Sequence, residues 1–87
     1  VGAAHGAVEL AIVNTKPDAV QIGARLVALR RERGWSMRDS AERIGIAAGT
    51  LSNYETGKRD LPLPVAFAAA SAFGMSVCDL IPELGAA

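Results

Sequence analysis

The sequence predicts an all-α fold in which five short helices pack into one compact domain. Of the 87 residues, 51% are apolar but only 5% are aromatic. The core would therefore consist mainly of Ala, Leu, Ile and Val, which suits short, closely packed helices. Apolar residues recur at intervals of three and four, as on one face of a helix. Two S-x-x-D motifs, at residues 36–39 and 76–79, are typical of helix starts.

The first predicted helix covers residues 17–33 and ends at Gly34. Its start would be formed by a capping side chain, a proline in the first turn and an acidic residue at the positive end of the dipole, namely Thr15, Pro17 and Asp18. The apolar stripe of this helix consists of Ile22, Leu26 and Leu29. Residues 1–16 show no clear period, and we predict an N-terminal arm that is flexible or binds a partner.

Two short helices are predicted next, over residues 36–44 and about 48–55. The first begins at the Ser36 capping box and ends at Gly45, which is expected in the left-handed conformation of a tight turn. The second lacks a Ser, Thr, Asp or Asn cap, so its start should be weaker, and Gly57 ends it. The inward-facing residues of the two helices are predicted to be Ala41, Ile44, Leu51 and Tyr54.

The last two helices follow a stiff Asp-Leu-Pro-Leu-Pro linker at residues 60–64. The longer helix closes at Gly74, and its apolar stripe is predicted to be Leu63, Phe67, Ala70 and Phe73. The shorter helix begins at the second capping box and stops at Pro82. Its apolar residues are Val77, Leu80 and Ile81. Residues 83–87 are predicted to be a C-terminal tail.

Composition argues against several classes of protein. The single cysteine, Cys78, allows no internal disulfide and no Cys-rich metal site, so a reduced cytosolic setting is expected. We expect neither a membrane span nor a signal peptide, because no apolar run approaches ~20 residues and no basic n-region precedes the first apolar stretch. No His or Cys is partnered for catalysis. We therefore expect no enzymatic activity, no metal, no cofactor and no small-molecule ligand.

Charge is unevenly distributed along a chain whose net charge is zero. Residues 25–59 contain eight basic and four acidic residues, a net charge of +4, whereas residues 1–24 sum to −1 and residues 60–87 to −3. A basic segment between acidic flanks suits a surface in which one face meets an anion. An ordinary solvated helix surface is the alternative interpretation.

The second helix, the Gly45 turn and the third helix form the most informative pattern. Two short helices that cross steeply need a small residue in the turn and apolar residues on both inner faces. These requirements are met by Ala41, Gly45, Ile46, Leu51 and Tyr54. Such an arrangement would leave the outer face of the third helix free to enter a DNA major groove.

Three stretches between Ile22 and Ile81 resemble a known family: RLVALRRERGWSMRDSAERIGI, TLSNYETGKR and AFGMSVCDLI. They are similar to the lambda-repressor-like, Cro/C1-type helix-turn-helix domain, also called the xenobiotic-response-element (XRE) type, and we assign residues 17–82 to this domain. The resemblance implies a bacterial or phage transcriptional regulator, expected to be a repressor that binds a palindromic operator in double-stranded DNA as a homodimer. It also implies an ion pair between Arg30 and Glu55, for which Arg31 is an adjacent competitor.

The resemblance places most DNA contacts on particular residues. Base contacts would come from the recognition helix, about residues 48–55, at Ala48, Gly49, Thr50, Ser52 and Asn53. Phosphate contacts are expected at Met37, Arg38, Thr56, Lys58 and Arg59, with Arg43 as a further candidate. Family members often have Gln at position 37 and polar side chains at 47–49, where this chain has Met37, Ala47, Ala48 and Gly49. Base discrimination is therefore expected to depend on few side chains, of which Asn53 is best placed for adenine.

The sequence is compatible with two functional hypotheses. The first is a DNA-binding regulator, cytoplasmic and associated with the nucleoid, which the Lys58–Arg59 pair and the basic segment favour. The second is a protein-interaction module that sequesters another regulator or oligomerises with it, which the sparse recognition helix and the zero net charge favour. A dimer surface is expected on the last helix, at Val77, Leu80, Ile81 and Leu84, or on the N-terminal arm around Leu10, Ile12 and Val13.

Overall fold

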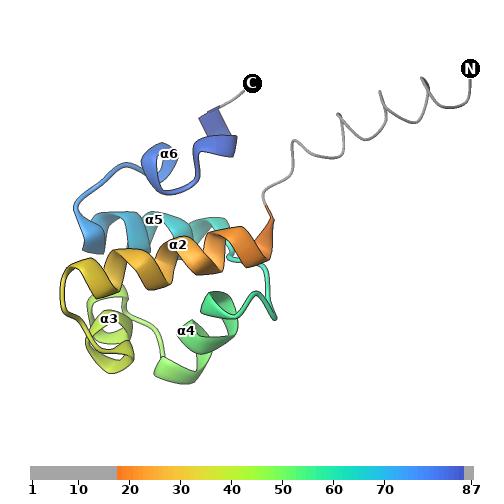
Figure 1. Ribbon diagram of the computed structural model, residues 1–87. Helices are drawn as coiled ribbons and strands as arrows, with labels where there is room; N and C mark the ends of the chain where they lie inside the picture. Colours follow the sequence, from red (N-terminus) through yellow and green to blue (C-terminus); the bar gives the residue numbers. More distant parts are fainter. Residues whose placement is uncertain (1–17, 86–87) are drawn as a thin grey trace, which may run out of the picture.

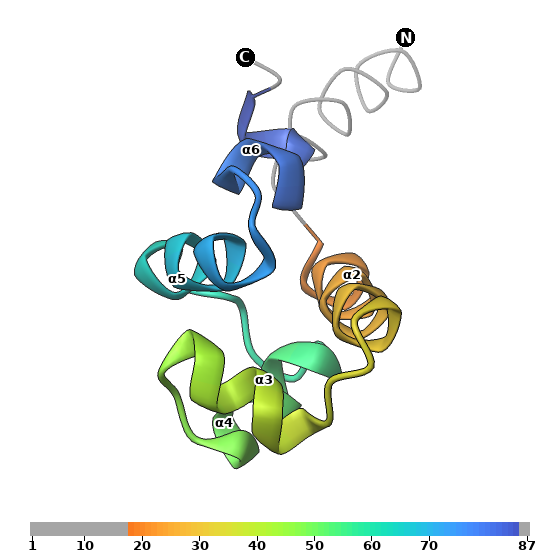
Figure 2. The same cartoon turned by 90° about the vertical axis from the view of Figure 1, so that its left-hand side faces the viewer.

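The structure is a computed structural model that describes residues 18–85, and the regular elements of this part of the chain are all helices. The helices are α2 (Ala19–Glu32), α3 (Met37–Ile44), α4 (Ala48–Glu55), α5 (Leu63–Phe73), α6 (Val77–Leu80) and the 3-10 helix η1 (Pro82–Gly85). The predicted all-α class is confirmed. In both views α2 and α5 form a middle layer, with α3 and α4 on one side of it and α6 on the other (Figure 1, Figure 2).

The helix starts follow from local hydrogen bonds. The Asp18 side chain caps α2 by accepting a hydrogen bond from the amide of Val20, so the helix begins later than predicted; Thr15 and Pro17 lie outside the described residues. Both predicted capping boxes are present: the hydroxyls of Ser36 and Ser76 accept hydrogen bonds from the amides three residues later. The start of α4 has no side-chain cap, as its sequence predicts.

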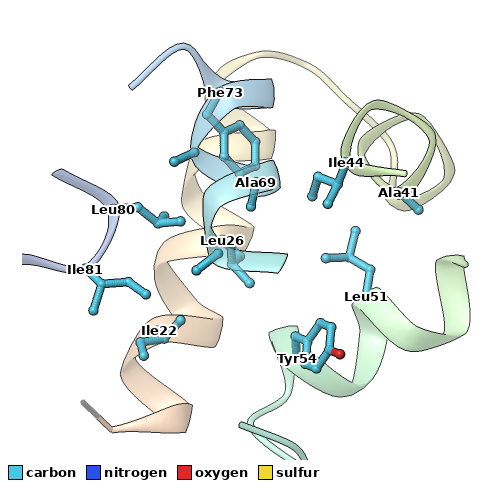
Figure 3. Packing of buried hydrophobic residues seen from close by; sticks show 12 residues of the cluster. Ile22, Leu26, Ala41, Ile44, Leu51, Tyr54, Ala69, Phe73, Leu80 and Ile81 are labelled. Atoms are coloured by element: carbon cyan, nitrogen blue, oxygen red, sulfur yellow. The ribbon is translucent and has the colours of Figure 1, made fainter. Parts of the chain in front are cut away.

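The core lies where the three layers meet (Figure 3). Its buried apolar residues are Ile22, Leu26, Ala41, Ile44, Leu51, Tyr54, Ala66, Ala69, Ala70, Phe73, Leu80 and Ile81. The predicted inward-facing residues of α2, α3 and α4 are all among them, except Leu29, which is partly buried against the cluster. Burial of Leu51 and Tyr54 fixes the inner face of α4, so the outer face of that helix is also fixed.

The apolar stripe predicted for α5 is wrong at two positions. Leu63 and Phe67 are 53% and 55% exposed, and Ala66 and Ala69 are buried instead. Both sets of residues have helical spacing, so periodicity alone does not choose between them. The distance between packed helices depends on the side chains at their contact, and small alanines allow a close approach of α5 to the rest of the core. The larger side chains are therefore left on the solvent side.

The last helix also departs from its prediction. Leu80 and Ile81 are 1% and 3% exposed, because they pack into the core of this same chain. They are therefore not available as an exposed dimer surface, which corrects the prediction for these two residues. Of the other two candidates, Val77 is half-buried and Leu84 is exposed. The predicted end of this helix is confirmed, because α6 ends at Leu80, before Pro82, and Pro82 begins the 3-10 helix η1.

An ion pair holds η1 against α2. The Arg25 guanidinium donates two hydrogen bonds to the Glu83 carboxylate, both 2.9 Å long. Position 83, where the predicted C-terminal tail begins, is thus tied to α2. Hydrogen bonding by Arg25 lowers the pKa of Glu83 to about 2, with Coulombic attraction as a smaller cause.

Replacing Glu83 by glutamine is expected to remove a pH-dependent part of the stability. The pKa of Glu83 is below its ordinary value of 4.5, so the ion pair stabilises the folded state above pH 4.5 and this contribution is lost as the pH falls toward 2. Because a quarter of the Glu83 side chain is exposed, we expect an effect of less than about 1 kcal/mol at neutral pH. Urea denaturation of Glu83→Gln and wild type should give different free energies of unfolding at pH 7 and similar ones near pH 2. A constant difference over this range would contradict the assignment.

Candidate nucleic-acid interface

The turn between α3 and α4 has the backbone geometry that its sequence predicts. Gly45 adopts φ 91° and ψ 31°, in the left-handed region. The amides of Gly45 and Ile46 both donate hydrogen bonds to the carbonyl of Ala41, at 2.8 and 3.0 Å. This closure ends α3 and reverses the chain, so that α4 starts at Ala48. Together α3, the turn and α4 form a helix-turn-helix.

Gly23 allows α2 and α4 to approach closely. It is buried in α2, and a Cβ atom placed on it would lie 2.5 Å from the carbonyl oxygen of Tyr54 and 2.8 Å from the carbonyl carbon of Glu55. These are backbone atoms of the last turn of α4, so a side chain at position 23 would displace this helix. The importance of Gly23 was not predicted from the sequence. Its only signal was an isolated glycine within a helical pattern, which can mark close approach of another backbone.

A largely buried ion pair also fixes α4. The Arg30 Nε atom lies 2.7 Å from one Glu55 oxygen, and its Nη2 atom lies 3.2 Å from the other. The Arg30 and Glu55 side chains are only 15% and 4% exposed, and Arg30 also donates to the carbonyl of Trp35. Arg31, the adjacent competitor, is exposed. The ion pair implied by the family resemblance is therefore present, and it links the last turn of α2 to the end of α4.

The outer face of α4 is bare at its start. Ala48 and Gly49 are exposed, and a Cβ atom on Gly49 would have no neighbour within 4 Å. Thr50, Ser52 and Asn53 are half-buried. Within residues 18–85 the side chains of Ser52 and Asn53 make no hydrogen bond, which leaves their donors and acceptors free to meet a ligand. The surface combines open space at its N-terminal end with two polar side chains farther along.

The segment after α4 presents two exposed cations. Lys58 and Arg59 are both exposed, and the Arg59 amide is anchored by a hydrogen bond to the carbonyl of Asn53 at 3.2 Å. The Thr56 hydroxyl donates to the carbonyl of Ser52 at 2.9 Å, so it is used in ending the helix. The loop therefore has a defined backbone from which the two cationic side chains extend.

The candidates on α3 differ in how they could meet a phosphate. Arg38 is exposed in the first turn of the helix. Met37 is partly buried against the core cluster, and a thioether is a poor hydrogen-bonding group. Position 37 could therefore contribute its backbone amide at the helix start, but not a side-chain donor. Of these two residues, only Arg38 supplies positive charge.

Arg43 belongs to a stack of aromatic and cationic groups that the sequence patterns did not predict. Its guanidinium lies 4.3 Å from the centroid of the Trp35 ring, which stacks on Phe73 at 5.6 Å. On the Phe73 side, the Arg33 guanidinium lies 5.2 Å from the ring centroid and donates to the Phe73 carbonyl at 2.7 Å. The contact with Trp35 restrains the exposed Arg43 side chain through a cation–π interaction. Arg43 would therefore contact a phosphate either from its place over the Trp35 ring or after giving up this contact.

The internal contacts change the interpretation of the +4 central segment. Three of its eight basic residues are engaged within the domain: Arg25 by Glu83, Arg30 by Glu55, and Arg33 by backbone carbonyls. The exposed cations nearest to the helix-turn-helix in sequence are Arg38, Arg43, Lys58 and Arg59. Part of the positive charge of this segment is therefore used in contacts within the domain. The charge that is available to an anion lies on a few side chains in and after α3 and α4.

The described part of the chain offers neither a metal-binding cluster nor a membrane-spanning helix. Residues 18–85 contain no group of three acidic, His or Cys side chains placed to hold a metal ion. None of the helices in this range combines the length and the apolar character needed to cross a membrane.

Comparison with known families identifies this arrangement. A family model described as a helix-turn-helix domain matches residues 21–81, which is more than half of the chain. The chain belongs to the helix-turn-helix family of DNA-binding transcriptional regulators. This is a family of regulators and not of enzymes. A search of curated protein sequences gave no significant match.

Solved structures of helix-turn-helix regulators resemble this one. The clp gene regulator ClgR from Corynebacterium glutamicum is 28% identical, with a TM-score of 0.68 over 77% of this chain and 87% of that one. The restriction-modification controller protein C.AhdI from Aeromonas hydrophila is also 28% identical, with a TM-score of 0.70 over 74% and 97% of the two chains. An HTH_3 family transcriptional regulator from Vibrio cholerae shares the fold at 24% identity, with a TM-score of 0.69 over 76% and 37% of the chains.

Proposed function

We propose that this protein is a transcriptional regulator, acting as a repressor, that inserts α4 into the major groove of double-stranded DNA. The observation that carries the proposal is the position of α4: its inner face is locked in the core, its outer face is open, and two exposed cations follow it. The related proteins at 28% identity are named as a clp gene regulator and a restriction-modification controller. A bacterial or phage origin and a location at the nucleoid are part of the same proposal.

Affinity would come mainly from the DNA backbone. Lys58 and Arg59 would neutralise phosphates beside the groove, and Arg38 would do so at the start of α3, where helix amides also favour an anion. Arg43 is a weaker candidate because Trp35 holds its guanidinium. Each neutralised phosphate releases counterions, so the binding should depend steeply on salt.

Base discrimination would be limited. Asn53 offers a bidentate contact to adenine, Ala48 a contact to a thymine methyl group, and Gly49 only space for close approach. One good bidentate contact contributes about 1–3 kcal/mol of discrimination. The remaining specificity would depend on the shape and deformability of the DNA. Two copies bound to two half-sites would add the affinity that a single small domain lacks, which is why we propose a homodimer.

The test is fluorescence anisotropy with a duplex from upstream of the gene and a scrambled duplex, each over a series of salt concentrations. Wild type should bind both duplexes, prefer the upstream one, and weaken as salt rises. The Lys58→Ala/Arg59→Ala variant should bind more weakly, with the slope of log K against log salt reduced by about 1 for each residue.

The matched control is Arg31→Ala, which removes an exposed arginine from the end of α2. This change should leave the salt slope nearly unaltered. A loss in the control half as large as in the double variant, which removes twice the charge, would show that only net charge matters. Absence of binding by a folded wild-type protein near physiological salt would favour the protein-interaction module instead.

A further inference from the structure

A pocket lies between the end of α4 and the start of α5. It has a volume of about 400 Å³ and is lined by Tyr54, Arg59, Asp60 and Pro62. Pockets that bind small molecules commonly measure about 300–1,000 Å³. Tyr54 lies in the last turn of α4, and Pro62 is the N-cap of α5. The other two residues belong to the loop between these helices. We call this site the loop pocket, and it adjoins the segment that would contact DNA phosphates.

Most of the wall of the loop pocket is held in place by the fold. Tyr54 is 7% exposed, and its ring belongs to the core cluster (Figure 3). The hydrogen bond from the Arg59 amide to the carbonyl of Asn53, 3.2 Å long, fixes the backbone of the loop. Pro62 has φ −64°, the value that its ring imposes. A pocket with preformed walls binds a ligand without the cost of ordering them.

Three polar groups of different chemistry meet at the loop pocket. Arg59 contributes a cation, Asp60 an anion and Tyr54 a hydroxyl. Within residues 18–85, these three side chains take part in no ion pair and no hydrogen bond. Both charged residues are exposed. All three groups are therefore available to a ligand.

The two opposite charges favour a ligand that carries both signs. A plain anion would pair with Arg59 but would be repelled by Asp60, and a plain cation would meet the reverse problem. A DNA phosphate has no positive group for Asp60, so the pocket as a whole does not suit it. A free α-amino acid carries a carboxylate and an ammonium on one carbon atom. These groups match charges on consecutive residues, whose Cα atoms are about 3.8 Å apart.

The rest of the wall sets the kind of amino acid. Pro62 and the ring of Tyr54 offer apolar surface with no further charged group. A polar ligand side chain placed there would lose its hydrogen bonds to water without replacement, whereas an apolar side chain would not. The pocket therefore suits an amino acid with an apolar side chain. Its carboxylate would meet Arg59 and the Tyr54 hydroxyl, and its ammonium would meet Asp60.

We propose that the loop pocket binds a free amino acid with an apolar side chain, which pairs with the Arg59 guanidinium in place of a DNA phosphate. Ligand binding by the free protein stands on the pocket alone, whereas its effect on DNA rests on the proposed function. A guanidinium that holds a carboxylate through two parallel hydrogen bonds is no longer free for a phosphate. Occupation of the pocket therefore weakens DNA binding, and the amino acid acts as an inducer.

The first experiment titrates L-leucine into ¹⁵N-labelled protein without DNA and follows the backbone amides by nuclear magnetic resonance. Saturable shifts are expected at residues 54 and 58–61, with a dissociation constant of about 1 mM because the ligand is small. Two matched compounds separate the charges: 4-methylpentanoate lacks the ammonium of leucine, and 3-methylbutylamine lacks its carboxylate. Each should bind at least about 10-fold more weakly than leucine.

The same titration is repeated on two variants. Asp60→Asn removes the anion of the pocket with little change of shape, and it should weaken leucine binding about 10-fold or more. Glu32→Gln is the matched control, because it removes another exposed carboxylate at the end of α2, and it should bind leucine like wild type. Both positions are exposed, so the amide spectra should show both variants folded.

The second experiment measures anisotropy with the upstream duplex, with and without saturating leucine. For wild type and Glu32→Gln, leucine should lower the affinity for DNA about 5-fold near physiological salt and reduce the salt slope by about 1, as expected for one lost phosphate contact. Asp60→Asn should bind DNA equally well with and without leucine.

The two experiments separate the possible failures. A protein that binds leucine but no DNA would refute the proposed function and leave the ligand site standing. The proposal is overturned if a large excess of leucine causes no saturable shift, or if the two single-charge compounds bind as well as leucine. It is also overturned if Asp60→Asn binds leucine like wild type, or if bound leucine leaves the affinity of wild type for DNA unaltered.

Discussion

Replacing Gly23 by alanine is expected to destabilise the domain by about 3 kcal/mol or more. The added methyl group would lie 2.5 Å from the carbonyl oxygen of Tyr54, and backbone atoms of α4 cannot rotate away as a flexible side chain can. Relief of the overlap requires α2 and α4 to move apart, which opens the core around Leu26 and Leu51. Urea denaturation followed by Trp35 fluorescence and far-UV circular dichroism would measure the loss.

The chain contains a matched control for this substitution. Gly49 also lies in a helix, but a Cβ atom there would have no neighbour within 4 Å. Gly49→Ala should therefore leave the free energy of unfolding unchanged or raise it by up to about 1 kcal/mol, because alanine restricts the unfolded chain. If Gly23→Ala were as well tolerated as Gly49→Ala, the close packing of α4 on α2 would be incorrect.

Replacing Arg30 by methionine should cost about 3–5 kcal/mol, because it leaves the Glu55 carboxylate buried without a partner. The Glu55 side chain is only 4% exposed, and both of its oxygens accept hydrogen bonds from Arg30. The double variant Arg30→Met/Glu55→Met should recover most of the stability, since an apolar pair of similar volume often replaces a buried ion pair without loss. Denaturation of both single variants and the double variant gives the coupling energy directly.

Arg31→Met is the control for the ion pair. Arg31 is exposed and adjacent in sequence, so its replacement should change the free energy of unfolding by less than about 0.5 kcal/mol. A cost for Arg31→Met equal to that for Arg30→Met would mean that Glu55 pairs with either arginine. No recovery in the double variant would mean that the loss comes from packing of the arginine side chain and not from an unpaired charge.

The helix-turn-helix was predictable because its signals are local. These signals are the Ser36 capping box, the left-handed Gly45 and the apolar residues of α3 and α4. Each of them determines the backbone or the buried face of residues close to it in the sequence. Lys58 and Arg59, which are exposed, were expected as phosphate contacts through the resemblance to the family. The Arg30–Glu55 pair joins distant segments, and it was expected only through the resemblance to the family.

Features that depend on a distant partner could not be predicted from the same patterns. The face that α5 buries is decided by how closely it approaches its neighbours, which favoured Ala66 and Ala69 over Leu63 and Phe67. The need for glycine at position 23 follows only from the last turn of α4, which lies against this residue in the fold. The stack of Arg43 on Trp35 likewise needs the fold to bring α3 beside the turn after α2.

We propose that α4 and the loop after it form the DNA-contacting surface of this regulator, and chemical-shift mapping by nuclear magnetic resonance is the decisive experiment for this claim. ¹⁵N-labelled protein would be titrated with the upstream duplex while the backbone amide shifts are followed. The largest changes are predicted at the start of α3, along residues 48–53 and in the loop 56–59, with small changes in α6 and η1. Changes concentrated on α6 and η1, with the amides of α4 unaffected, would contradict the claim.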